Sequence, residues 1–262
     1  MSQLSVTDLP NRPTTALQVL ELLEPLNVRA KELKRRENER HGTPWETRHR
    51  MANGIEAAVG LTQVQMTVLH HAQSGHFLGR SADDPTKVIR LDFPKVAGLA
   101  PETDMTFAQE SYEVFARTGL LLQAQFQVER MMEDLLRALR RPIKGLEHNA
   151  RDLLQHARVS APVRKASWVY LPLLMRNTLH NGGFHGRSNR QITVGKTKYV
   201  FKKDRRFEQA GWHHITHALS AELDVLDELL ASPTLVQLGL VPDRFAFLLD
   251  NGYLPRRSVY VS

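Results

Sequence analysis

The sequence predicts a mainly α-helical protein with one small β-hairpin. Long stretches repeat apolar residues every three or four positions, which is typical of helices with one buried face. Two short runs of alternating apolar and polar residues flank Gly195 and Lys196, which predicts two strands joined by a tight turn. Apolar residues make up 42% of the 262 positions, so the chain can bury a sizeable core.

The first 73 residues are mostly helical by this pattern. Residues 15–40 have helical spacing, and we expect Pro25 to divide them into two helices, because an internal proline removes a backbone hydrogen bond and clashes with the preceding turn. The charged run 29–41 predicts a solvated helical face. Residues 41–50 contain Gly and Pro and predict a loop, and residues 52–73 predict a further helix.

The middle of the chain contains a change in composition. Residues 74–105 are rich in Gly, Pro, Asp and Ser, with one strand-like piece at 87–93, and predict a boundary. A long helix is expected at 106–140, a shorter one at 146–159 and a last long one at 208–232. The apolar face of the 106–140 helix is predicted to contain Phe107, Val114, Leu121, Phe126, Val128, Met132, Leu135 and Leu139. We therefore divide the chain into an N-terminal helical region, a helical domain and a C-terminal extension, at residues 1–105, 106–232 and 233–262.

Residues 171–185, LPLLMRNTLHNGGFH, are typical of the end of a buried helix. Pro172 either starts this helix or kinks one that already runs from Ser167. Gly182 and Gly183 follow at once, and glycine readily adopts the left-handed conformation that ends many helices. We expect a helix that ends at about residue 180 with a glycine cap.

Three polar residues lie in the last turn of this helix. Arg176 and His180 are four positions apart and share one face, where unpaired backbone carbonyls favour positive charge. An arginine that binds phosphate beside a histidine that transfers protons could form a small phosphate site. The Asn177 amide could hold the loop or a substrate hydroxyl. The alternative is a helix end whose Arg and His side chains bond to its own carbonyls.

The run RNTLHNGG at a helix end resembles the signature of the HEPN superfamily, over roughly residues 106–232. The resemblance implies an all-helical HEPN-type bundle that cleaves RNA without a metal or cofactor, at a site formed across a homodimer. It implies that His180 assists attack of the ribose 2′-hydroxyl or protonates the leaving oxygen. Arg176 would stabilise charge on phosphorus, and Asn177 would orient the phosphate or the histidine. The setting would be a toxin–antitoxin pair or phage defence, with RNA and an antitoxin protein as candidate partners.

The motif departs from the superfamily in its spacing. Three residues separate Arg176 from His180, whereas the superfamily has four to six. This spacing favours the alternative function, a non-catalytic helical module that binds nucleic acid or a protein. The sequence therefore leaves open whether the protein is an enzyme.

Net charge of +7 and a pI near 9.8 favour a polyanionic partner. The hairpin and its flanks are especially basic, and Tyr199 and Phe201 are interleaved with the cations. This pattern predicts binding to a nucleic-acid backbone with base stacking on the aromatics. The alternative is a hairpin with its aromatics packed inward and a solvated basic edge. The predicted nucleic-acid-binding residues are Lys196, Lys198, Lys202, Lys203, Arg205 and Arg206.

Other chemistries have little support. The absence of cysteine excludes disulfides, thiolate nucleophiles and sulfur-ligated zinc. His213, His214 and His217 have spacings that could bind a metal from one helical face, but no carboxylate has a suitable spacing, and we expect no metal. Phosphate loops of the GxxxxGK[ST] and GxGxxG types are missing. The N-terminus does not resemble a signal peptide and no apolar run is long, so we expect a cytoplasmic protein that does not enter a membrane.

Overall fold

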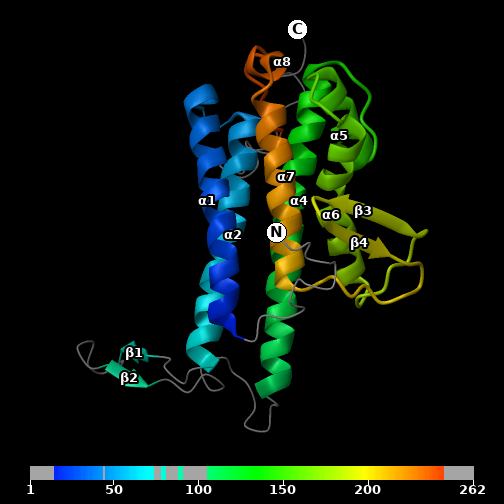
Figure 1. Cartoon of the computed structure of the whole chain (residues 1–262). Helices are drawn as coiled ribbons and strands as arrows, with labels where there is room; N and C mark the ends of the chain where they lie inside the picture. The colour runs from blue at the N-terminus through cyan, green and yellow to red at the C-terminus, as the bar shows by residue number, and fades with distance from the viewer. Residues whose placement is uncertain (1–14, 44, 74–77, 81–87, 91–104, 245–262) are drawn as a thin grey trace, which may run out of the picture.

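The structure is a computed structural model, and it describes residues 15–43, 45–73, 78–80, 88–90 and 105–244 (Figure 1). This part of the chain is mainly α-helical, with a β-hairpin directly after the motif helix, which confirms the predicted class. None of its helices combines the length and apolar character needed to cross a membrane. The elements are α1 (Ala16–His41), α2 (Thr47–Gln73), β1 (Leu78–Arg80), β2 (Val88–Arg90), α4 (Met105–Ala138), α5 (Leu146–His156), α6 (Pro162–His180), β3 (Arg190–Val194), β4 (Thr197–Phe201), α7 (Trp212–Leu230) and α8 (Pro233–Val236).

The long helices lie side by side in a bundle (Figure 1). α1 packs on α2, α2 on α4, α4 on α6, α6 on α7, and α7 back on α1. One buried apolar cluster runs through all of them, and Leu26, Ile55, Leu120 and Leu219 from four different helices line the same small cavity. In the described residues, the predicted boundary at 105/106 therefore does not separate two cores.

α1 is one continuous helix, so the prediction that Pro25 splits it is wrong. Thr15 and Gln18 form a reciprocal capping box at its start. Pro25 lies on the exposed side, while Leu23 and Leu26 are buried on either side of it. Burial of the apolar stripe on both sides of the proline holds the helix together despite the lost hydrogen bond.

α2 begins at Thr47, inside the stretch that we predicted to be a loop. The side-chain carboxylate of Glu46 accepts the backbone N–H groups of Arg48 (2.7 Å) and His49 (3.1 Å). These bonds satisfy donors that a helix leaves unpaired in its first turn. The predicted loop is therefore shorter than residues 41–50, because α1 ends at His41 and α2 begins at Thr47.

The predicted boundary segment 74–105 is described only in part. The strand-like piece at 87–93 contributes β2, which pairs antiparallel with β1, and the remainder of 74–104 lies outside the described residues. α4 confirms the predicted long helix and extends to Ala138. However, Val114 and Phe126 are exposed, so their assignment to the buried face is wrong.

α6 and the hairpin that follows it position the motif. α6 begins at Pro162, so Pro172 lies inside a running helix and does not start one. In the hairpin, Val194 pairs with Thr197, which leaves Gly195 and Lys196 as the turn, with Gly195 at φ +57°. This confirms the predicted two-residue turn.

Candidate functional site

The last turn of α6 holds the predicted catalytic residues. Arg176 is half-buried, and its Nε and Nη2 groups both donate to the side-chain oxygen of Asn177, at 3.1 and 2.7 Å. His180 is the last residue of the helix and is exposed. Asn177 therefore orients the arginine, and the Nη1 group of Arg176 is left out of this pair. This differs from the predicted role of Asn177 in orienting a phosphate or the histidine.

The helix ends in a glycine cap, as predicted. Gly182 and Gly183 have φ angles of +67° and +89°. The Gly183 N–H donates to the Thr178 carbonyl (2.9 Å), and the Gly182 N–H donates to the Leu179 carbonyl (3.1 Å). Backbone groups therefore satisfy these carbonyls, and Arg176 bonds to an amide side chain instead. The alternative in which Arg and His cap their own helix does not account for Arg176.

The loop after His180 is joined to the basic segment that follows β4. The His185 N–H donates to the Arg205 carbonyl (3.1 Å), and the Phe207 N–H donates to the Gly183 carbonyl (2.8 Å). Gly183 also lies against Arg206, because a Cβ atom built on the glycine would be 3.9 Å from Cγ of that arginine. The fold thus brings together the motif end of α6 and a basic segment more than twenty residues further along the chain.

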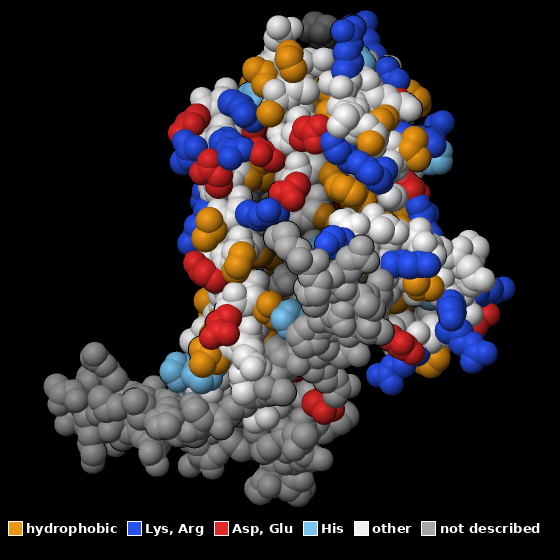
Figure 2. Space-filling model, viewed as in Figure 1, with side chains coloured by type: hydrophobic (Ala, Val, Ile, Leu, Met, Phe, Trp, Pro, Cys, Tyr) orange, Lys and Arg blue, Asp and Glu red, His pale blue; other side chains and the backbone are white. Residues whose placement is uncertain are grey.

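An open hollow of about 1130 Å³ lies on this basic segment. Four cations and two carboxylates are among its lining residues, which are Phe184, Lys198, Val200, Lys202, Asp204, Arg205, Arg206, Glu208, Gln209 and His214. Figure 2 shows Lys and Arg side chains gathered over the region of the hairpin. His180 does not line the hollow but precedes the loop that contributes Phe184 to it.

All six predicted nucleic-acid-binding cations are exposed, and none of them forms an ion pair with another described residue. Arg190, at the start of β3, is different. It pairs with Glu147 and lies over the Tyr170 ring, with its guanidinium carbon 4.8 Å from the ring centroid. The six predicted cations that are exposed are Lys196, Lys198, Lys202, Lys203, Arg205 and Arg206.

The predicted base-stacking role of Tyr199 and Phe201 is wrong, because neither side chain is exposed. The alternation of the hairpin directs both rings to the face that packs on the helices, and Phe201 stacks on Phe207 with centroids 4.3 Å apart. Near the hairpin, Phe184 is an exposed aromatic, at 53%, and it lines the hollow. Sequence reasoning missed it, although a phenylalanine in the polar loop NGGFHGRSN was a usable signal.

The histidines near the hairpin are structural. His185 is buried between Thr178 and Ser188, with its ring nitrogens 3.4 Å from the hydroxyl and 3.1 Å from the carbonyl. Burial lowers the pKa of His214 to about 4, with smaller contributions from its histidine neighbours. His217 has a pKa lowered by burial and bonds to the Tyr199 hydroxyl at 2.8 Å. The neutral, buried rings of His214 and His217 suit packing better than contact with RNA.

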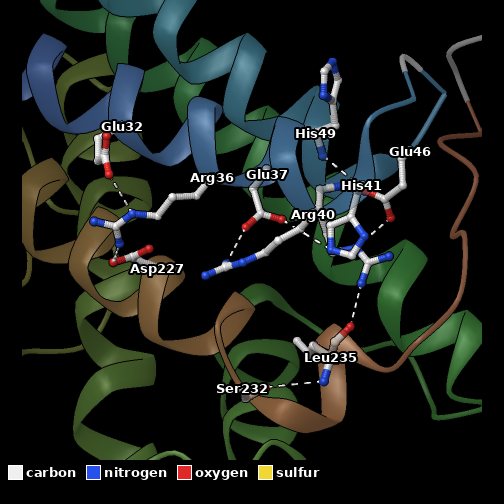
Figure 3. Close-up of polar contacts among 11 residues, drawn as sticks. Glu32, Arg36, Glu37, Arg40, His41, Glu46, His49, Asp227, Ser232 and Leu235 are labelled. Carbon is white, nitrogen blue, oxygen red and sulfur yellow. Dashed lines mark hydrogen bonds and ion pairs between the residues drawn. The ribbon is translucent and has the colours of Figure 1, made fainter.

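A second polar cluster, which the sequence did not predict, lies at the other end of α7 (Figure 3). Arg48 and Glu46 are fully buried and paired at 2.6 Å, and Arg48 also donates to the Leu235 carbonyl at 2.6 Å. Glu37 is buried beside His41, with Nε2 and Oε2 3.6 Å apart. Burial raises the pKa of Glu37 and lowers that of His41. The Arg48–Leu235 bond joins α2 to α8, and the charge of Arg48 also acts on Glu37 and His41 of α1, which indicates a role in closing this end of the bundle.

In the part of the chain that the structure describes, no three His, Asp or Glu side chains lie close enough together to hold a metal ion. Comparisons with protein-family models, with curated proteins and with solved structures gave no match to this chain. The function must therefore be argued from the residues themselves.

Proposed function

We propose that the protein is a HEPN-like, metal-independent endoribonuclease of the cytoplasm, which acts in a toxin–antitoxin pair or in phage defence. The observation that carries the proposal is the junction between the end of α6 and the basic hollow. There, an exposed His180 and a half-buried Arg176 precede a loop that is hydrogen-bonded to the Lys202–Arg206 segment. We take this basic surface as the phosphate-binding surface and His180 as the proton-transferring group.

In this proposal the RNA backbone lies along the cations of the hollow, because its phosphates are attracted to closely spaced Lys and Arg side chains. Phe184 offers an exposed ring on which one base stacks. His180 takes the proton of a ribose 2′-hydroxyl as that oxygen attacks the adjacent phosphorus, or protonates the 5′-oxygen as it leaves. Arg176, oriented by Asn177, stabilises the charge on the phosphoryl oxygens through its remaining N–H groups. The products would be a cyclic 2′,3′-phosphate and a free 5′-hydroxyl.

Replacing His180 or Arg176 by alanine should lower the rate of RNA cleavage by at least about 100-fold, because each removes a group that acts only on the transition state. The measurement is cleavage of total RNA by purified protein, together with growth of a bacterial host after induction. Arg151→Ala and His156→Ala are the matched controls, since both residues lie on α5, His156 is its last residue, and the Arg–His spacing is similar. Cleavage that survives both motif substitutions in folded protein would show that the site is wrong.

The second candidate function is a binding module without catalysis. It is favoured by the three-residue spacing of the motif and by the position of His180 outside the hollow. Wild-type protein that binds RNA, leaves it intact and does not slow growth would support this candidate over the ribonuclease.

Replacing Lys202, Lys203, Arg205 and Arg206 together by alanine should weaken RNA binding and reduce its salt dependence. Each phosphate contact that is lost lowers the slope of log affinity against log salt by roughly 0.7 for a single strand. Fluorescence anisotropy with a labelled oligoribonucleotide at several salt concentrations gives both quantities. Four exposed cations elsewhere, replaced together, provide a control of equal charge: Lys31, Arg35, Arg137 and Lys144. Unchanged affinity and slope in the variant with alanine at positions 202, 203, 205 and 206 would exclude this surface as the RNA-binding site.

A further inference from the structure

The outer side of α2 and α4 carries an apolar face without a partner among the described residues. Phe115 on α4 is 68% exposed and Val64 on α2 is 60% exposed. On each helix, the residues of this face follow one another at intervals of four, three and four positions. We call this surface the α2–α4 face, and it consists of Ala57, Leu61, Val64 and Val68 on α2 and Phe115, Gly119, Leu122 and Phe126 on α4.

The four face residues on α2 and the four on α4 lie at the same height along the bundle. α2 and α4 pack antiparallel (Figure 1), and Gly54 lies directly against Gln127, where a Cβ atom would approach the side-chain Cδ to 2.5 Å. A helix rises 1.5 Å per residue, so Leu61 lies about 10 Å from that contact along α2. Leu122 lies about 8 Å from it along α4, in the same direction because the helices are antiparallel. The two sets of residues therefore form one face about 17 Å long, with the two helices contributing equally.

None of the eight side chains of this face is itself charged. Within its span, Arg117 donates to the Ala210 carbonyl (3.0 Å), and just beyond it the guanidinium carbon of Arg130 lies 5.8 Å from the centroid of the Phe126 ring. Residues 57–73 contain no Asp, Glu, Lys or Arg, and neither do residues 118–128. The solvent side of a helix normally carries charges, and isolated exposed apolar residues need no explanation, whereas a contiguous apolar patch marks a binding surface. A lack of charge together with exposed phenylalanines is the composition of the centre of a protein–protein interface.

We propose that the α2–α4 face binds a second copy of this chain, giving a homodimer held by a four-helix bundle of α2 and α4 from both copies. A two-fold axis through the middle of the face brings the apolar residues of one copy onto those of the other. The face is complementary to itself, because it is built from two antiparallel helices whose apolar residues have the same spacing. A partner of different chemistry would find no charge on this face to recognise.

The area of the face is also large enough for a homodimer interface. Its five large side chains (Leu61, Val64, Phe115, Leu122 and Phe126) expose on the order of 600 Å² per copy, so that two copies cover roughly 1,200 Å², the lower end of stable interfaces. The interface contains neither Arg176 nor His180, so each copy keeps its own α6 end. The dimer proposed here therefore does not form the site between subunits that the HEPN resemblance implies, and it does not depend on the ribonuclease activity.

Sedimentation velocity of the full chain, over a range of micromolar concentrations, tests the dimer. Wild-type protein should sediment as a species of twice 29.8 kDa. The double variant Val64→Glu, Leu122→Glu should sediment as a monomer with unchanged helical circular dichroism, because both side chains are exposed in one chain and would place charges in the interface.

The matched control is Leu17→Glu, Val28→Glu, two exposed apolar residues on α1 that lie outside the face. This variant should remain dimeric. The proposal is overturned if the wild-type protein stays monomeric at every concentration. That is the result expected if another part of its own chain covered the face. A dimer that the Val64→Glu, Leu122→Glu variant still forms also overturns it.

Discussion

Replacing Arg48 by methionine should lower the free energy of unfolding by about 3–5 kcal/mol, the typical loss when one partner of a buried ion pair is removed. For a chain of this size that corresponds to a fall in Tm of about 6–20 °C. The Arg48 side chain is not exposed at all. Its loss would leave the buried Glu46 carboxylate without its counter-charge.

Arg48 also holds the end of the bundle closed. Its Nη1 group donates to the Leu235 carbonyl at 2.6 Å, and its Nη2 group donates to the Gly239 carbonyl at 3.0 Å. Methionine has a similar length but cannot donate, so both carbonyls would lose the arginine donor, and the Leu235 carbonyl would keep only backbone donors such as the Leu238 N–H (3.2 Å). Lysine keeps the charge but lacks the planar fork that reaches several acceptors at once, so Arg48→Lys should be intermediate.

Thermal unfolding followed by circular dichroism measures the effect. Arg35→Met is the control, because Arg35 also forms ion pairs within α1 but is exposed, and its loss should leave Tm close to the wild-type value. The double variant Glu46→Gln, Arg48→Met should recover part of the loss, since no unpaired charge remains. An Arg48→Met variant as stable as Arg35→Met would show that this pair does not stabilise the fold.

The predictable part of the fold is the part fixed by local pattern. The register of β3 and β4 follows from Gly195 and from the alternation around it, and the long helix α4 follows from its apolar period. The continuity of α1 through Pro25 and the early start of α2 were not predictable in this way. They depend on burial of Leu23 and Leu26 against other helices and on capping by the Glu46 side chain.

The site was predictable to a similar extent. The sequence places Arg176, Asn177 and His180 at a capped helix end, and the structure has them there. Whether Tyr199 points to solvent or to the core depends on which face of the hairpin the helices cover, and alternation alone does not decide this. Residues 41–50 were predicted as a loop, so the burial of Glu46 and Arg48 was not predicted, because charged residues are seldom buried unless paired. The bonds from Arg48 to the Leu235 and Gly239 carbonyls are tertiary contacts that a local pattern does not reveal.

Replacing Glu222 by glutamine should stabilise the protein at alkaline pH and leave it nearly unchanged at pH 4–5. Glu222 lies in the centre of the bundle, and burial raises the pKa of its carboxyl to about 8. The adjoining cavity of about 10 Å³ is at the lower limit for a single water, so hydration contributes little to the ionised form. The carboxyl is therefore mostly protonated in the folded protein at neutral pH.

The sign of the pH dependence follows from linkage. The folded-state pKa of about 8 exceeds the unfolded value near 4.5, so the stabilisation from this group is complete below pH 4.5 and is lost as the pH rises through 8. The total loss is on the order of 5 kcal/mol at 1.36 kcal/mol per unit of pKa. Glutamine cannot ionise, so the variant escapes this loss.

Gln125 supports a protonated Glu222. Its Nε2 group donates to both carboxyl oxygens at 2.8 Å, while its own Oε1 atom is buried without a hydrogen-bond partner among the described residues. A protonated carboxyl can donate to that oxygen after a small rotation of the amide, whereas an ionised one cannot. The amide group of glutamine at position 222 can make the same pair of bonds.

Urea unfolding of wild type and Glu222→Gln at pH 5, 7 and 9 gives the difference in unfolding free energy directly. That difference should be near zero at pH 5 and grow to several kcal/mol, on the order of the linkage value, at pH 9. Asp224→Asn, on the same helix but with a 60% exposed side chain, should show no such growth. If the difference in unfolding free energy between wild type and Glu222→Gln does not change with pH, the carboxyl is ionised in the folded bundle. Gln125 alone would then offset the cost of burying it.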